Sequence, residues 1–198
     1  MNGKLTVTGE IYKNFIDYEG AELIKGEVNF RKNSKDNKVI FGDSFKSNSL
    51  EIAINGKNNV IRFGANVKFQ GKIIVYGNKI NVEIGQNTTT ESVYILCRDA
   101  GVKIGKNCMF SRDIEIRSSD THKIFINNER TPYNRAEEVI IGDHVWIAAK
   151  AFVSKGSHIP SGSIVGACSF VGKKFTKENC ILAGVPAKII KENISWER

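Results

Sequence analysis

Apolar and small residues recur with a period of six over residues 141–176. This interval divides without a break into the hexads IGDHVW, IAAKAF, VSKGSH, IPSGSI, VGACSF and VGKKFT. Every hexad begins with Ile or Val, and its second position holds only Gly, Ala, Ser or Pro. The first position is therefore predicted to be buried, and the second to lie where only a small residue fits.

A period of six matches neither the 3.6 residues of an α-helical turn nor the two-residue alternation of an exposed strand. It fits a triangular solenoid, in which three hexads form one coil of about 18 residues and the first positions fill the interior. Stacked coils then pair their backbones as parallel strands. The hexads therefore predict an all-β solenoid.

The same signature recurs less regularly upstream, as VIFGDS, VIRFGANV, VEIGQN and VKIGKN. Its glycines are Gly42, Gly64, Gly85 and Gly105, followed by Gly142, and one coil with a short bulge explains the first three gaps between them. The last gap is much longer and predicts an excursion loop at residues 123–138, directly after His122. Residues 1–38 are expected to form irregular first coils, and residues 177–198 a C-terminal cap.

Composition is that of a globular protein and gives no sign of a membrane span. The 198 residues are 41% hydrophobic and 25% charged and contain no Pro-, Gly- or Ser-rich linker, so residues 1–198 are expected to form a single domain. The apolar runs fall far short of the roughly 20 residues that cross a bilayer. The N-terminus, MNGKLTVTGEIYK, has no apolar core of a signal peptide, and we expect a cytoplasmic location.

Cysteine spacing and net charge narrow the chemistry. The four cysteines show neither CxxC spacing nor a neighbouring His cluster, so we expect reduced thiols and no metal, with a cysteine nucleophile left open as an alternative. A net charge of +8 favours anionic partners such as CoA phosphates or an acidic polysaccharide. The basic run RKNSKDNK over residues 31–38 lacks interleaved aromatics, and no nucleic-acid partner is expected.

Three segments carry a family resemblance: EIRSSDTH, ending at His122; VIIGDHVWIAAK, containing Trp146; and NCILAGVPAKIIKENISW near the C-terminus. With the hexads, they resemble the hexapeptide-repeat acyltransferases, and residues 108–198 resemble bacterial capsular polysialic acid O-acetyltransferases. The resemblance implies a left-handed parallel β-helix, a homotrimer with sites between subunits, and acetyl-CoA as co-substrate. It also implies acetyl transfer to a hydroxyl of a surface polysaccharide, acidic or sialic-acid-containing.

The resemblance also implies roles for individual residues. Transfer to a hydroxyl requires a base, and an imidazole can accept a proton near neutral pH. The catalytic base of the family corresponds to His122, whose ring Asp120 or Glu115 could orient, and Trp146 would lie beside the thioester. Small residues that allow close approach of CoA, and lysines that could neutralise its phosphates, complete the expected donor site: Ala149, Ala167, Gly172, Lys173 and Lys188.

Other functions remain open from the sequence. The acceptor could be a small amino sugar or nucleotide sugar, modified on oxygen or nitrogen. A zinc-dependent carbonic-anhydrase-like enzyme shares this kind of solenoid, although His122, His144 and His158 do not form a pair on one coil. A non-catalytic solenoid is the third alternative. An acidic polymer is favoured by cations in the surrounding sequence: Arg112, Arg117, Arg130 and Arg135.

Overall fold

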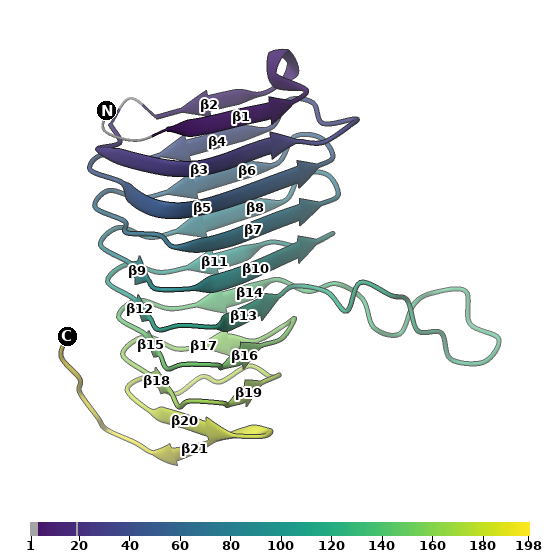
Figure 1. Cartoon of the computed structure of the whole chain (residues 1–198). Helices are drawn as coiled ribbons and strands as arrows, with labels where there is room; N and C mark the ends of the chain where they lie inside the picture. Colours follow the sequence, from purple (N-terminus) through teal and green to yellow (C-terminus); the bar gives the residue numbers. More distant parts are fainter. Residues whose placement is uncertain (1–3, 19) are drawn as a thin grey trace.

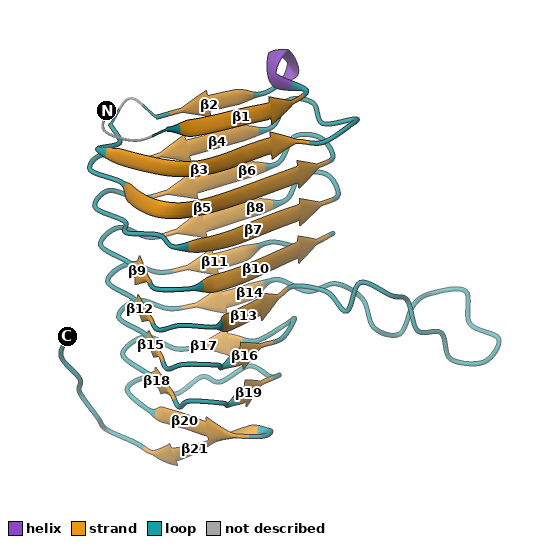
Figure 2. Cartoon of the chain, viewed as in Figure 1, coloured by secondary structure: helices purple, strands orange, loops and turns teal. Residues whose placement is uncertain are grey.

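The computed structural model describes residues 4–18 and 20–198 as a β-solenoid (Figure 1). The chain runs to the right across the front of Figure 1, returns to the left across the rear, and descends by one coil per turn, so the winding is left-handed. The predicted all-β, left-handed parallel β-helix is confirmed. Besides strands and loops, the described residues contain one 3-10 turn, η1 (Ile11–Lys13) (Figure 2).

Three sheets form the faces of the solenoid. The eight-stranded front sheet contains β1 (Leu5–Gly9), β3 (Leu23–Phe30), β5 (Lys46–Asn55), β7 (Gly71–Tyr76), β10 (Val93–Arg98), β13 (Ile114–Arg117), β16 (Phe152–Val153) and β19 (Phe170–Val171). The seven-stranded back sheet contains β2 (Phe15–Asp17), β4 (Lys38–Phe41), β6 (Val60–Phe63), β8 (Asn81–Ile84), β11 (Val102–Ile104), β14 (Val139–Ile141) and β17 (His158–Ile159). The six-stranded third sheet contains β9 (Thr89–Thr90), β12 (Met109–Phe110), β15 (Trp146–Ile147), β18 (Ile164–Val165), β20 (Ile181–Gly184) and β21 (Ala187–Lys191).

Strand pairing shows the length of each coil. Val153 pairs with Val171, three hexads further along the chain, as the repeat requires. Val93 pairs with Ile114, a longer step, because coils in the first half carry extra residues in their turns. The coil from Ile116 to Val153 is by far the longest, since it contains the loop between β13 and β14.

The first coils are paired in register with those that follow. β1 pairs with β3, and β2 with β4, in the same parallel sense as the later strands. Within the described part of this range, residues 4–18 and 20–38, the chain forms η1, and β3 meets β5 with a register shift between Ile24 and Gly26. Residues 1–3 and 19, for which irregular coils were also expected, lie outside the described residues.

Aliphatic residues at the first hexad position fill the interior, as predicted. None is more than 1% exposed: Ile141, Ile147, Val153, Ile159, Val165 and Val171. The second position faces the backbone of the next coil, and a Cβ on Gly142 would lie 2.6 Å from the Ser161 nitrogen. Close stacking of the coils therefore explains why this position holds small residues.

An asparagine ladder aligns the corner between the front and back sheets in the first half. Asn59 donates to Asn37 Oδ1 from both its backbone and its side-chain nitrogen, each at 2.9 Å. Asn59 Oδ1 in turn accepts the Ile80 backbone N–H at 2.9 Å, and Asn37 donates to Asn14 Oδ1. Asn37 and Asn59 are buried, so these bonds satisfy polar groups that water cannot reach.

Two segments lie outside the stacked coils. The loop over residues 118–138, which contains the predicted excursion at 123–138, extends far to the right of the solenoid in Figure 1. After β20 the chain reverses into the antiparallel strand β21, and residues 192–198 run back along the left side of the molecule. No helix among the described residues is long and apolar enough to cross a membrane.

Candidate active site

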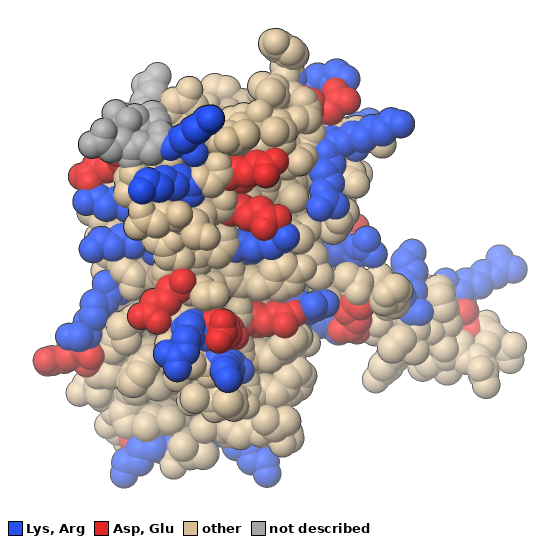
Figure 3. Space-filling view, in the orientation of Figure 1, with Lys and Arg blue, Asp and Glu red and all other residues tan. Residues whose placement is uncertain are grey.

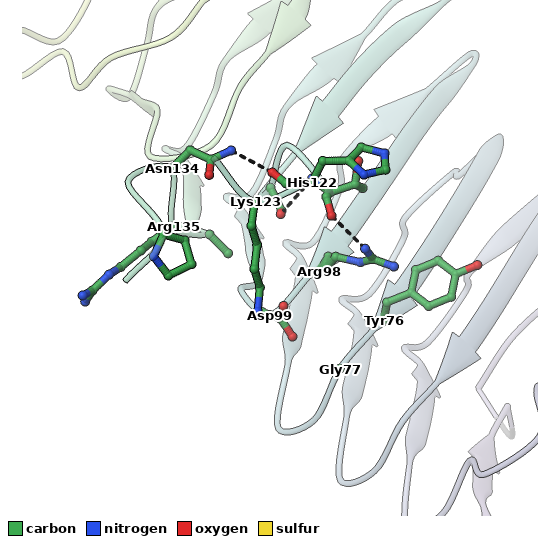
Figure 4. A pocket seen from close by; sticks show the side chains of 12 residues that line it. Tyr76, Gly77, Arg98, Asp99, His122, Lys123, Asn134 and Arg135 are labelled. Carbon is green, nitrogen blue, oxygen red and sulfur yellow. Dashed lines mark hydrogen bonds between the residues drawn. The ribbon is translucent and has the colours of Figure 1, made fainter. Parts of the chain in front are cut away.

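A cavity of about 430 Å³ opens where the loop over residues 118–138 leaves the solenoid. The ends of β7 and β10 supply Tyr76 and Arg98, and the loop supplies His122 and Arg135 (Figure 4). Its remaining lining residues are Gly77, Asp99, Ser119, Thr121, Lys123, Pro132, Asn134 and Ala136. The cavity thus joins residues from three coils around one histidine.

His122 is held through its backbone. Its N–H donates to the Asp120 carbonyl at 2.8 Å, and its own carbonyl accepts the Asn134 side-chain N–H at 2.9 Å. The side chain is exposed, and within the described residues no hydrogen bond engages the imidazole. Both ring nitrogens are therefore free of hydrogen bonds to the described residues.

The two carboxylates expected to orient the imidazole have other partners. Asp120 Oδ2 accepts from Lys155 Nζ at 2.7 Å and from Asn134 Nδ2 at 2.8 Å. The hydrogen bond from Lys155 is the main reason that the pKa of Asp120 lies below its ordinary value, and partial burial opposes it. Glu115 pairs with Arg117 on the front sheet. Asp120 therefore joins the first part of the loop to its returning part and to the next coil.

The cavity carries unbalanced positive charge. Arg98 donates from Nη1 to the Thr121 carbonyl at 2.9 Å, which fixes the backbone next to His122. Arg98, Lys123 and Arg135 form no ion pair with any carboxylate in the described part of the chain, and Asp99 is the lone carboxylate of the lining. Such a site favours an anionic ligand.

Trp146 lies on a different face from His122. It occupies β15 of the third sheet, paired with Met109 and Ile164 on the adjacent coils. Its half-buried ring lies 6.1 Å from that of Trp196 in the C-terminal tail. Trp196 stacks on His144 with ring centroids 4.1 Å apart, and its indole N–H donates to the His144 carbonyl at 3.1 Å. The tail therefore packs beside Trp146.

The other predicted donor-site residues follow the lower coils. Ala149 and Ala167 lie on adjacent coils, where the Cys168 N–H donates to the Ala149 carbonyl at 3.0 Å. A Cβ on Gly172 would lie 2.7 Å from the Phe170 ring. Exposed lysines complete the set: Lys173, whose Nζ is 5.0 Å from the Phe175 ring centroid, and Lys188 on β21. Neither these residues nor Trp146 line the His122 cavity of the same chain.

The cysteines and potential metal ligands are dispersed. Cys97, Cys108 and Cys180 are buried and Cys168 is exposed, all four as free thiols. Across residues 4–18 and 20–198, no three His, Cys, Asp or Glu side chains gather as a metal site would need. Of the cations that the sequence suggested near the site, Arg135 lines the cavity and Arg117 is paired with Glu115.

Several residues around His122 were not predicted from the sequence. Tyr76 and Arg98 occupy paired positions on successive coils, so the coil spacing could have aligned them. Asn134 and Lys155 had no such signal, because the first lies in a loop without periodicity and the second contacts Asp120 across the excursion.

Known proteins resemble this chain in both sequence and fold, although no protein-family profile matches it. A polysialic acid O-acetyltransferase of Neisseria meningitidis is 34% identical over 163 residues, which cover 82% of this chain and 76% of the relative. A polysialic acid O-acetyltransferase of Escherichia coli O1:K1 is 38% identical over 140 residues, or 70% of this chain, and the match spans only 45% of that relative.

Two crystal structures share the fold over nearly the full length. The polysialic-acid-specific acetyltransferase NeuO superimposes with a TM-score of 0.87 and 32% identity, covering 99% of this chain and 89% of NeuO. The polysialic acid O-acetyltransferase OatWY has a TM-score of 0.87 and 28% identity, covering 100% of this chain and 92% of OatWY. The fold and these similarities define a hexapeptide-repeat acetyltransferase. Within that class, the chain belongs to the family of the polysialic acid O-acetyltransferases.

Proposed function

We propose that this protein transfers the acetyl group of acetyl-CoA to a hydroxyl of an acidic bacterial surface polysaccharide, with a sialic-acid-containing capsule as the leading acceptor. The observation that carries the proposal is His122, which presents a free imidazole to a cavity rimmed by the unpaired cations Arg98, Lys123 and Arg135. The relatives named polysialic acid O-acetyltransferases support the choice of acceptor. A cytoplasmic location remains a prediction.

In the proposed reaction, His122 acts as general base. The acceptor hydroxyl gives its proton to a ring nitrogen as its oxygen bonds to the thioester carbonyl carbon. The resulting tetrahedral intermediate collapses when the C–S bond breaks, and the departing CoA thiolate takes the proton from the imidazolium. A positioned base typically contributes about 10²- to 10⁴-fold to such a step.

We further propose that the donor binds between subunits of a homotrimer. Trp146 and the small residues Ala149, Ala167 and Gly172 lie away from the His122 cavity of their own chain, so a site that uses both sets needs a second subunit. Extended pantetheine could run along the small residues, with Lys173 and Lys188 near its phosphates. Trp146 would then pack beside the thioester.

Release of CoA thiol from acetyl-CoA tests the function across a panel of acceptors. Polysialic acid should support the highest kcat/KM, while neutral dextran and free amino sugars should give little release above the background without acceptor. Mass spectrometry of the polymer should show a gain of one acetyl group per thiol released. Better use of an amino sugar or nucleotide sugar than of every acidic polymer would replace the polymer with a small acceptor.

A further inference from the structure

We propose that Arg31, Tyr76 and Arg98 form an acceptor track, which leads out of the His122 cavity and binds acidic sugars of the polymer that flank the sugar acetylated at His122. The inference rests on the proposed function, because it names how that site would hold a long anionic chain. It adds Arg31, a residue outside the His122 cavity, to the acceptor site.

The three side chains form one packed unit at the corner that ends the front strands. The Arg98 guanidinium carbon lies 5.1 Å from the Tyr76 ring centroid, and that of Arg31 lies 5.4 Å from it. Arg31 also donates a hydrogen bond to the Tyr76 hydroxyl. Contacts of this kind hold a guanidinium in place and leave N–H groups free for a carboxylate.

Strand register makes this unit a line along the solenoid. Arg31 directly follows Phe30, which pairs with Ile54; Asn55 then pairs with Tyr76, and Tyr76 with Arg98. Three steps between coils separate the backbones of Arg31 and Arg98, or about 14 Å at about 4.8 Å per strand. Both side chains lean toward Tyr76, so their guanidinium carbons lie at most about 10.5 Å apart. Even this shorter distance exceeds the length of one sugar, so the line suits more than one unit of a polymer.

Charge along the line is not balanced locally. Neither Arg31 nor Arg98 forms an ion pair with a carboxylate among residues 4–18 and 20–198, whereas eight other cation–carboxylate pairs occur there. Figure 3 shows Lys and Arg side chains gathered along the right edge of the upper coils. Two positioned guanidinium groups without carboxylate partners favour a ligand that carries more than one carboxylate.

The line leads directly to the proposed base. In Figure 4, Arg98 lies between Tyr76 and His122, and it donates to the carbonyl of the neighbouring Thr121. The buried asparagine ladder aligns the same corner, which keeps the spacing of the coils fixed. A polymer bound along the line would therefore present a later sugar to His122.

Arg31→Gln tests the track at the one member that does not line the cavity. Arg62→Gln is the matched control, because Arg62 is an exposed arginine on β6 of the back sheet. With saturating acetyl-CoA, KM is measured for long polysialic acid and for a sialic acid dimer. Arg31→Gln should raise the KM for the long chain about fivefold, leave kcat unchanged and leave the dimer unaffected. Arg62→Gln should change neither KM.

Equal effects of the two substitutions, or an equal effect on chain and dimer, would overturn the track. A rise in the KM of acetyl-CoA instead would assign Arg31 to the donor-binding site and overturn the track.

Titration of the protein with polysialic acid alone, against neutral dextran, separates this inference from the proposed function. If the wild type binds polysialic acid through Arg31 but does not acetylate it, the function fails and the track stands. If the wild type acetylates polysialic acid and the Arg31→Gln protein binds this polymer normally, the proposed function stands and the track fails.

Discussion

At the scale of single residues, His122 depends on groups that hold its backbone. Asp120, bonded to Lys155 and Asn134, ties the loop to the adjacent coil, and Arg98 fixes the Thr121 carbonyl. None of these contacts reaches the imidazole itself. They are positioning interactions, so their loss should lower turnover without removing the base.

Asp120→Asn should lower kcat about tenfold while leaving the KM of acetyl-CoA unchanged, because the amide accepts a weaker hydrogen bond from Lys155. Glu115→Gln is the matched control, since Glu115 pairs with Arg117 on the front sheet. Equal loss of turnover in both variants would refute a positioning role for Asp120.

The difference in unfolding free energy between wild type and Asp120→Asn should depend on pH. The pKa of Asp120 is lowered in the folded protein, chiefly by Lys155, so the ionised carboxylate stabilises the fold above its unfolded pKa of about 3.9. That contribution is lost as pH falls through the lower folded pKa. Because the Asp120 side chain is 41% exposed, wild type and Asp120→Asn should differ by about 1 kcal/mol or less in urea unfolding at pH 7, and by less still at pH 3.

Burial predicts the reactivity of the thiols. It raises the pKa of Cys97 to about 12 and that of Cys108 to about 11, so neither should form appreciable thiolate at pH 8. Brief iodoacetamide treatment of the native protein should therefore modify Cys168, the exposed thiol, before these two. Peptide mapping measures the order, and fast modification of Cys97 or Cys108 would contradict it.

At the scale of elements, the hexads determined what could be predicted. From β14 to β19 every coil consists of three hexads with one aliphatic residue per face, so sequence alone defined the coils. Earlier coils are longer, and on the third face Lys46, Lys68 and Thr89 meet only through isolated bridges. Their cores also use aromatic rings, as where Phe41 stacks on Phe63. The periodicity is therefore weaker there although the fold continues.

The C-terminal tail is expected to stabilise the lower coils. Trp196 is 9% exposed and its ring stacks on His144, so Trp196→Ala should lower the free energy of unfolding by about 2 to 3 kcal/mol. Glu197→Gln, a change at an exposed neighbour, should have almost no effect. Urea titration compares them, and a Trp196→Ala protein as stable as wild type would show that the tail contributes no packing energy.

At the scale of the whole molecule, the candidate base could be predicted from the sequence but its surroundings could not. His122 stood out because a motif and an excursion met there, whereas the cavity also needs Tyr76 and Arg98 from earlier coils. Those residues come together only when the coil lengths, including their extra residues, are known. Trp146 lies on another face, so its relation to His122 depends on how subunits assemble.

The homotrimer is itself a prediction. Flat-sided solenoids can pack about a threefold axis, and a site shared between subunits requires an oligomer. Sedimentation equilibrium should give three times the chain mass of 22.0 kDa. A monomer that retains full activity at the assay concentration would exclude the shared site.

The most direct test of the account is the rate at which His122→Ala acetylates polysialic acid. With saturating acetyl-CoA and polymer, kcat should fall by about 10²-fold or more, while donor binding and the oligomer persist. His158→Ala, on the back sheet, is the matched control and should retain nearly all activity. Near-normal acetylation by His122→Ala would contradict the account, because the residue on which the site is built would then not be the base.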